Sequence, residues 1–283
     1  MKENNFSKCL RLLELFFSKD NKSDIFEKFC FELMQTGYNV RRDCTVYNVK
    51  PHVYNQEMTN LYSKSDAFIY ELLVGSLEVE TIKKDDFIIN KIKEYFKGKN
   101  KINILCFGDG IGSDSLKFSK LGFKVTYFDI EGKLSNFAKL NFRINKVENL
   151  IQTVFDESCL IENAYDVIIC REVLEHLERP FETVKRLRSF LKNNGLFFLS
   201  ESFSSVNANF PTHLSSNLKY AKKTINMTVK EGFEFLESYN QTNLNMFKKE
   251  PMLDNSRFLS IPKKPLKLRF KKKIRDIIIY LLS

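Results

Sequence analysis

The sequence predicts an α/β fold in which a doubly wound, mostly parallel sheet follows a helical N-terminal region. Three observations support this prediction. Strand-like apolar runs alternate with helix-like segments from residue 102 to residue 200. Before residue 99, apolar positions recur at helical spacing. After residue 231, two short strand-like runs flank the polar segment 240–243, which is the format of an antiparallel hairpin.

The N-terminal third is predicted to be a helical cap. Residues 6–36 carry apolar side chains such as Leu10, Leu13 and Phe17 at helical spacing, and residues 57–74 and 85–96 continue the pattern. A polar hinge follows these helices. We therefore expect three parts, namely a helical cap on the substrate side over 1–98, an α/β domain over 99–250, and a linker with a basic amphipathic tail over 251–283.

The elements of the sheet domain follow from its apolar runs and their stop signals. The predicted strands are 102–107, 123–129, 151–155, 165–170, 196–200, 232–239 and 244–248. The predicted helices are 113–121, 132–145, 180–192 and 217–230. Gly122 and the segment Asn193-Asn194-Gly195 are interpreted as helix stops. Residues 202–212 lack periodicity and are predicted to form a loop.

Composition indicates a globular protein whose positive charge is concentrated near one end. The chain has 283 residues, 43% of them hydrophobic, and a net charge of +10. Eight basic residues lie between Lys263 and Arg275, among apolar residues at helical spacing. Such a helix could make peripheral contact with an anionic membrane or dock on its own domain, and we favour docking. We expect no specific nucleic-acid partner, because no reading element is recognisable. The oligomeric state is left open.

Cysteine usage and the N-terminus favour a cytoplasmic location. The six cysteines show no Cys-x-x-Cys spacing and no zinc pattern with histidine, so we expect reduced thiols and no bound metal. The N-terminal residues lack the apolar segment of a signal peptide.

A glycine-rich turn indicates a nucleoside cofactor. The strand 102–107 runs directly into Gly108, Gly110 and Gly112, which lets a ligand approach backbone N–H groups at the next helix N-terminus. Asp129 ends the following strand, where a carboxylate commonly holds a ribose. The spacing alone leaves NAD open, because Ser115 stands where a dinucleotide fingerprint has its third glycine and is itself small.

A longer stretch carries a more specific resemblance. Residues 165–177, which read YDVIICREVLEHL, precede Arg179-Pro180, a predicted helix and the segment KNNGLFF at 192–198. Over residues 100–250 the chain resembles class I S-adenosylmethionine-dependent methyltransferases, in particular small-molecule enzymes of quinone and sugar biosynthesis. The resemblance implies a Rossmann-like seven-stranded sheet whose last strand is antiparallel. It also implies methyl transfer to oxygen or nitrogen, less often carbon, of a small, carbohydrate or peptide acceptor.

The resemblance assigns cofactor roles by position. The glycine loop would contact the amino-acid part of S-adenosylmethionine, Asp129 would hold the ribose, and Asp156 would face the adenine amine with Phe155 beside the ring. The full set of implied cofactor-binding residues is Gly108, Asp109, Gly110, Gly112, Asp129, Ile130, Phe155, Asp156, Arg171, Glu172 and Val173.

One position departs from the family pattern. The family has an acidic residue two positions before the first glycine, where this chain has Cys106. Asp109 is the candidate to replace that charge at the cofactor ammonium. Otherwise the chain would be a non-catalytic S-adenosylmethionine-binding relative. A third hypothesis, an NAD(P)-linked oxidoreductase, lacks a Tyr-x-x-x-Lys pair after the fifth strand.

His213 is the candidate catalytic residue. It follows the fifth strand, where the substrate cleft of the family opens, and it could accept a proton from an alcohol or amine during methyl transfer. A loop histidine bonded to backbone is the alternative. For Glu175 and His176 we favour a structural or cofactor-proximal role, for His52 packing, and for Asp166 capping.

Overall fold

The sheet has the predicted architecture. The computed structural model describes residues 5–251, which belong to one compact unit, and the predicted basic tail lies outside the described residues. The seven strands are ordered β3-β2-β1-β4-β5-β7-β6. Strands β1 to β5 pair in parallel, whereas β7 runs antiparallel to both β5 and β6. The α/β prediction with an antiparallel last strand is therefore confirmed.

Most strands lie within one or two residues of their predicted bounds. They are β1 Asn103–Phe107, β2 Lys124–Phe128, β3 Ile151–Val154, β4 Tyr165–Arg171, β5 Leu191–Ser200, β6 Phe233–Ser238 and β7 Asn245–Lys249. The predicted start of β5 was wrong. Leu191 is fully buried and pairs with Tyr165, and an irregularity follows before Leu196 pairs with Val167. The preceding helix therefore ends at Phe190, and Asn193-Asn194-Gly195 lies within the strand.

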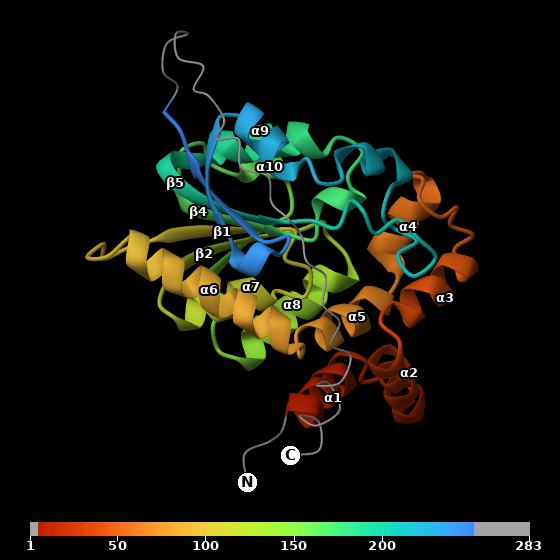
Figure 1. Cartoon of the computed structure of the whole chain (residues 1–283). Coiled ribbons are helices and arrows are strands. Elements are labelled where there is room, and N and C mark those ends of the chain that lie inside the picture. The colour runs from red at the N-terminus through yellow and green to blue at the C-terminus, as the bar shows by residue number, and fades with distance from the viewer. Residues whose placement is uncertain (1–4, 252–283) are drawn as a thin grey trace. The chain divides into compact units, whose positions relative to one another are not determined.

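Helices cover both faces of the sheet (Figure 1). One face is covered by α6 Val79–Tyr95, α7 Ser113–Lys120 and α8 Lys133–Ile144, and the other by α9 Pro180–Phe190 and α10 Thr224–Lys230. Ile88 and Ile92 of α6 lie in one apolar core with side chains of the strands on the face that α7 and α8 also cover. Helix α6 therefore packs against the sheet. The predicted helix 217–230 is divided into a short 3₁₀ helix and α10. The 3₁₀ helices are η1 Glu148–Leu150, η2 Glu157–Cys159, η3 Leu174–His176, η4 Ser215–Tyr220 and η5 Tyr239–Gln241.

Five further helices form the cap, whereas α6, which the sequence placed in the cap, packs on the sheet. They are α1 Asn5–Phe16, α2 Lys22–Met34, α3 Tyr38–Val46, α4 Gln56–Lys64 and α5 Ala67–Gly75. The sequence did not predict α3. The predicted helix 57–74 is interrupted at Ser65, whose hydroxyl donates to Asp43 at 2.6 Å and accepts the N–H of Ala67 at 3.0 Å. No helix within residues 5–251 combines the length and apolarity needed to cross a bilayer.

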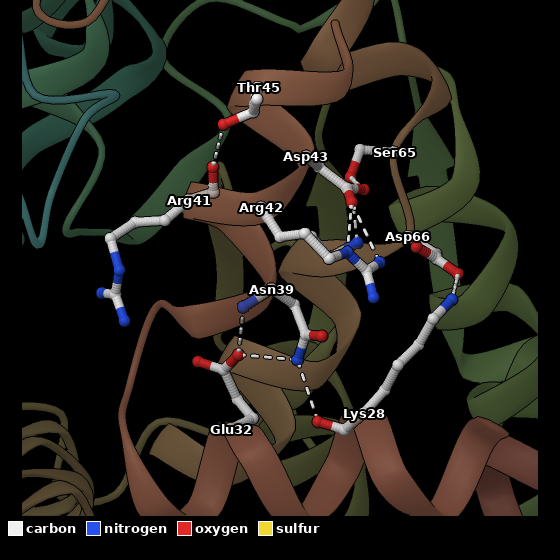
Figure 2. Close-up of polar contacts among 10 residues, drawn as sticks. Lys28, Glu32, Asn39, Arg41, Arg42, Asp43, Thr45, Ser65 and Asp66 are labelled. Atoms are coloured by element: carbon white, nitrogen blue, oxygen red, sulfur yellow. Dashed lines mark hydrogen bonds and ion pairs between the residues drawn. The ribbon is translucent and has the colours of Figure 1, made fainter. Parts of the chain in front are cut away.

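A polar network ties the cap helices together (Figure 2). Glu32 of α2 is fully buried and accepts the backbone and side-chain N–H groups of Asn39 at 3.0 and 2.8 Å. Arg42 pairs with Asp43 at 3.0 Å, and Lys28 pairs with Asp66 at 3.0 Å. These buried carboxylates have donors, and the resulting hydrogen bonds and ion pairs offset the cost of removing the carboxylates from water.

Candidate functional site

The loop after β1 requires glycine for two physical reasons. Gly108 and Gly112 have φ values of +71° and +77°, which side-chain-bearing residues rarely adopt. A Cβ at Gly108 would also lie 2.5 Å from a Val173 methyl, and one at Gly112 would lie 2.5 Å from the Phe142 ring. The loop after β4 and helix α8 therefore pack directly on the glycine backbone.

Asp129 closes this loop from the end of β2, as the sequence predicts. Its Oδ2 accepts the N–H of Gly110 at 2.6 Å, and its Oδ1 accepts the N–H of Ile130 at 2.7 Å. Burial raises the pKa of Asp129 to about 6, although both backbone donors oppose this shift. A half-buried carboxylate beside a glycine loop fits the hydroxyl groups of a ribose, which are hydrogen-bond donors.

The cap contacts the same loops. A Cβ at Gly110 would lie 2.5 Å from Leu72 Cδ1 of α5, and one at Gly132 would lie 3.0 Å from the backbone oxygen of Ser63 in α4. Helices α4 and α5 therefore cover the turns that follow β1 and β2. This position agrees with a cap over the carboxyl ends of the strands.

Asp109 faces the next helix. Its two carboxylate oxygens accept the N–H groups of Asp114 and Ser115 at 3.0 and 2.8 Å, at the N-terminus of α7. Burial and the neighbouring Asp114 raise the pKa of Asp109 to about 8. Cys106 is also buried, and burial raises the pKa of its thiol well above the usual range. Asp109 thus serves as a helix cap, and its role toward a cofactor ammonium stays a prediction.

Arg171, at the end of β4, lies in a buried charge network. Its guanidinium donates to Asp114 of α7, with Nε at 3.0 Å, and to Asp85 of α6 at 2.8 Å. Lys117 also pairs with Asp85. Asp85 was not among the predicted site residues, and no local sequence motif marked it. The network joins β4, α6 and α7 beneath the glycine loop.

The remaining predicted cofactor residues lie at the ends of β3 and β4. Glu172 has φ +52°, and its carboxylate accepts Ser202 Oγ at 2.5 Å and Asn243 Nδ2 at 2.9 Å. Burial opposes ionisation of Glu172, but serine hydroxyl donors hold its pKa below the usual value. Phe155 is half-buried with Lys139 Nζ 4.4 Å from its ring centroid, and exposed Asp156 accepts the N–H of Ser158.

His213 lies among aromatic rings in the loop after β5. Its ring stacks on Phe210 with centroids 4.9 Å apart and meets the His176 ring edge-on at 4.9 Å. His213 is 7% exposed, and its Nδ1 has no hydrogen-bond partner. Burial holds the pKa of His213 below the usual value, while the charge of Glu172 opposes this shift. The ring therefore favours its neutral form, which has a lone pair available to accept a proton.

His176 is held by the cap and by the loop of His213. Its Nδ1 lies 2.9 Å from Tyr62 Oη of α4 and 3.2 Å from the carbonyl oxygen of Thr212. Burial and the neighbouring His213 lower the pKa of His176 to about 4. From the sequence, Tyr62 belongs to a group of tyrosines that could line a substrate pocket, but a core role is favoured because aromatic side chains at helical spacing are more often core.

Glu175 completes the cluster. It is 1% exposed, and neither carboxylate oxygen has a hydrogen-bond partner. Burial and the nearby Glu172 raise its pKa well above the usual value. Potential ligand atoms of Glu175, His176 and His213 all lie within 4.8 Å of one another, so this group could hold a divalent cation, which the sequence analysis did not anticipate.

Comparisons with known proteins relate the sheet domain to enzymes. A family model described as "Methyltransferase domain" matches residues 82–248. A ubiquinone biosynthesis O-methyltransferase from Rickettsia typhi is 33% identical over 118 residues, which are 41% of this chain and 47% of the relative. An enzyme of the same name from Colwellia psychrerythraea is 33% identical over 132 residues, or 46% of this chain and 51% of the relative. The chain thus spans about half the length of these relatives.

Solved structures with a similar fold include two methyltransferases. The CurJ carbon methyltransferase matches with a TM-score of 0.48 and 15% identity, covering 69% of this chain and 58% of that one. The 1,6-didemethyltoxoflavin-N1-methyltransferase of Burkholderia thailandensis, solved with S-adenosylhomocysteine, matches with a TM-score of 0.46 and 15% identity. That match covers 63% of this chain and 81% of the other.

Proposed function

The chain belongs to the class I S-adenosylmethionine-dependent methyltransferase family, and from this premise we propose that it methylates an oxygen atom of a small acceptor. The observation that carries the proposal is the contact of Val173 with Gly108. Three residues after Val173 the same loop reaches His176, which meets His213. The loop after β4 therefore links a nucleoside-type site to half-buried His176 and buried His213, whose pKa values are both lowered.

We assign the binding of the cofactor to residues at the strand ends. In the proposed complex Gly108, Gly110 and Gly112 lie beneath the amino-acid part, Asp129 accepts the ribose hydroxyls, and Asp156 faces the adenine amine. Bound S-adenosylmethionine supplies an activated methyl group on a sulfonium. The cap residues Leu72 and Ser63, which already cover the loops, exclude water and orient the acceptor.

His213 is proposed as the general base. The His213 ring would take the proton of the acceptor hydroxyl as the carbon–oxygen bond forms and the carbon–sulfur bond of the sulfonium breaks. The imidazolium that results is stabilised by the ionised carboxylate of Glu172, which raises the proton affinity of His213. Burial and the charge of Glu172 raise the pKa of Glu175, which favours its neutral form beside His213.

The names of the curated relatives favour oxygen as the acceptor atom. Nitrogen acceptors use the same base and are the second choice. A phenolic hydroxyl is a suitable first probe, because one neutral histidine can assist its deprotonation. We also propose a cytoplasmic location, which the six free cysteines support.

Calorimetric titration with S-adenosylhomocysteine, with NAD as the control, tests the cofactor. We expect micromolar binding of the first compound and none of the second. Transfer of a labelled methyl group to 3,4-dihydroxybenzoate and to a panel of alcohols and amines then tests catalysis. If the protein binds the cofactor but methylates no compound of the panel, the alternative is favoured that it is a non-catalytic S-adenosylmethionine-binding protein. Cys106, in place of the family's acidic residue, is the reason for that alternative.

A further inference from the structure

One cap residue makes an unusual number of contacts with the segment that carries His213. His52 lies in the loop between α3 and α4. Its backbone N–H donates to Pro211 O at 2.7 Å, and its Nδ1 lies 2.9 Å from the carbonyl oxygen of His213. Its own carbonyl accepts the N–H and the hydroxyl of Ser215 at 3.0 and 3.2 Å. These four hydrogen bonds span the residues on both sides of His213.

The partner of Nδ1 determines the proton arrangement of His52. A backbone carbonyl can only accept, so Nδ1 carries the hydrogen and donates it to His213 O. This nitrogen is therefore not free to act as a base. His52 also acts on the main chain of His213, while the His213 ring contacts Phe210 and His176. The side chain of His52 thus influences the orientation of His213 without being part of the reacting set.

The backbone of His52 has a disfavoured conformation, and the hydrogen bonds of this residue help to maintain it. Its φ is +66°, in the left-handed region where a residue with a Cβ is disfavoured. Such a conformation persists when surrounding interactions impose it, and it concentrates at functional sites. The strain therefore supports a role for the hydrogen bonds of His52.

We propose that His52 is a positioning residue, which holds the carbonyl of His213 and thereby the orientation of the His213 ring. This inference rests on the proposed role of His213 as the base. It makes the cap loop 47–55 part of the acceptor site. It also links the two parts of the chain, because a cap that shifts away from the 211–215 segment would release the base.

Three substitutions of His52 isolate the donor. His52→Asn retains a side-chain N–H group close to the place of Nδ1, and asparagine tolerates left-handed φ. The aspartate side chain of His52→Asp has the same shape as that of asparagine but presents only acceptor atoms at neutral pH. His52→Gly adopts the backbone conformation without strain and has no side chain. Val53→Ala, at an exposed neighbour in the same loop, serves as the matched control.

The first readout does not require an active enzyme. The chain has three histidines, so ring ¹⁵N resonances of His52, His176 and His213 can be assigned with few overlaps. We expect the His213 ring signals to shift in His52→Asp and His52→Gly, and to stay near their wild-type positions in His52→Asn and Val53→Ala. Unchanged His213 signals in both donor-free variants would overturn the proposal.

The second readout is methyl transfer to 3,4-dihydroxybenzoate. We expect kcat to fall roughly tenfold in His52→Asp and His52→Gly, with the KM for S-adenosylmethionine unchanged and with recovery in His52→Asn. A rise in this KM with unchanged kcat would contradict a role in positioning the base. If the wild-type protein methylates no acceptor, the proposed function fails, whereas the His213 ring signals still decide whether His52 positions that ring.

Discussion

Asp129 and Gly110 are joined by a 2.6 Å hydrogen bond from the glycine N–H to Oδ2 of the carboxylate. This bond makes the end of β2 and the loop after β1 one unit. A ligand that uses the carboxylate therefore also lies against the glycine backbone.

Asp129→Ala should weaken S-adenosylhomocysteine binding about 30-fold to 100-fold, because the ribose hydroxyls lose a charged acceptor. Asp129→Asn keeps one side-chain oxygen that can accept the N–H of Gly110. Its affinity for S-adenosylhomocysteine should therefore lie between those of the wild-type protein and Asp129→Ala. Calorimetric titration of each variant measures the change. Wild-type affinity in Asp129→Ala would remove Asp129 from the cofactor site.

Binding should also depend on pH through Asp129. Its pKa in the free protein is raised to about 6, so the carboxylate becomes protonated as the pH falls through that value. The charged acceptor is then lost, and affinity for S-adenosylhomocysteine should fall by up to about tenfold per pH unit below pH 6. Titrations between about pH 5 and about pH 8 test this slope. Asp129→Asn should show a flatter profile, and equal slopes in both proteins would assign the titration to another group.

Gly108→Ala should destabilise the fold more than Gly122→Ala. Both residues have left-handed φ, of +71° and +86°, so each substitution should cost about 1 to 2 kcal/mol in backbone strain. Only at Gly108 would the new methyl group meet Val173, at 2.5 Å, which should add about 1 to 3 kcal/mol. Urea unfolding of the two variants separates these contributions. Equal losses of stability would mean that Val173 moves aside freely.

The sequence predicted those features that depend on residues close together in the chain. Three glycines after an apolar run and an aspartate at the end of the next strand predicted a nucleoside site, but the hydrogen bond that joins Gly110 to Asp129 was found only in the structure. The start of β5 could not be predicted in this way, because Leu191 joins the sheet through pairing with Tyr165, and no local pattern encodes that register.

The acceptor side depended on contacts between distant residues. His52 and the carbonyl that it holds are 161 residues apart in the chain, and Tyr62 is 114 residues from His176. Each side chain alone has the pattern of an ordinary cap aromatic. His213 was predicted from its place after the fifth strand, but the rings around it become visible only in the folded chain.

Arg171→Ala should destabilise the fold by about 3 to 5 kcal/mol, because it leaves Asp85 and Asp114 buried without their shared partner. Arg186→Ala is the matched control, since it removes the surface pair with Glu157, where the arginine side chain is 49% exposed. That loss should be at most about 1 kcal/mol. Thermal and urea unfolding measure both changes. A small effect at Arg171 would indicate that water replaces the guanidinium in this network.

His213→Ala should lower turnover with 3,4-dihydroxybenzoate by about 10² to 10⁴, the usual contribution of a general base. The affinity for S-adenosylhomocysteine should stay within about twofold of wild type, because no predicted cofactor contact is removed. Burial holds the pKa of His213 below its usual value, so the wild-type enzyme should retain its base in the neutral form down to mildly acidic pH. Raising the pH should restore part of the activity of the variant, since a phenol that ionises in solution needs no base. If turnover survives at neutral pH without such dependence, the proton is accepted elsewhere, and His176 becomes the next residue to substitute.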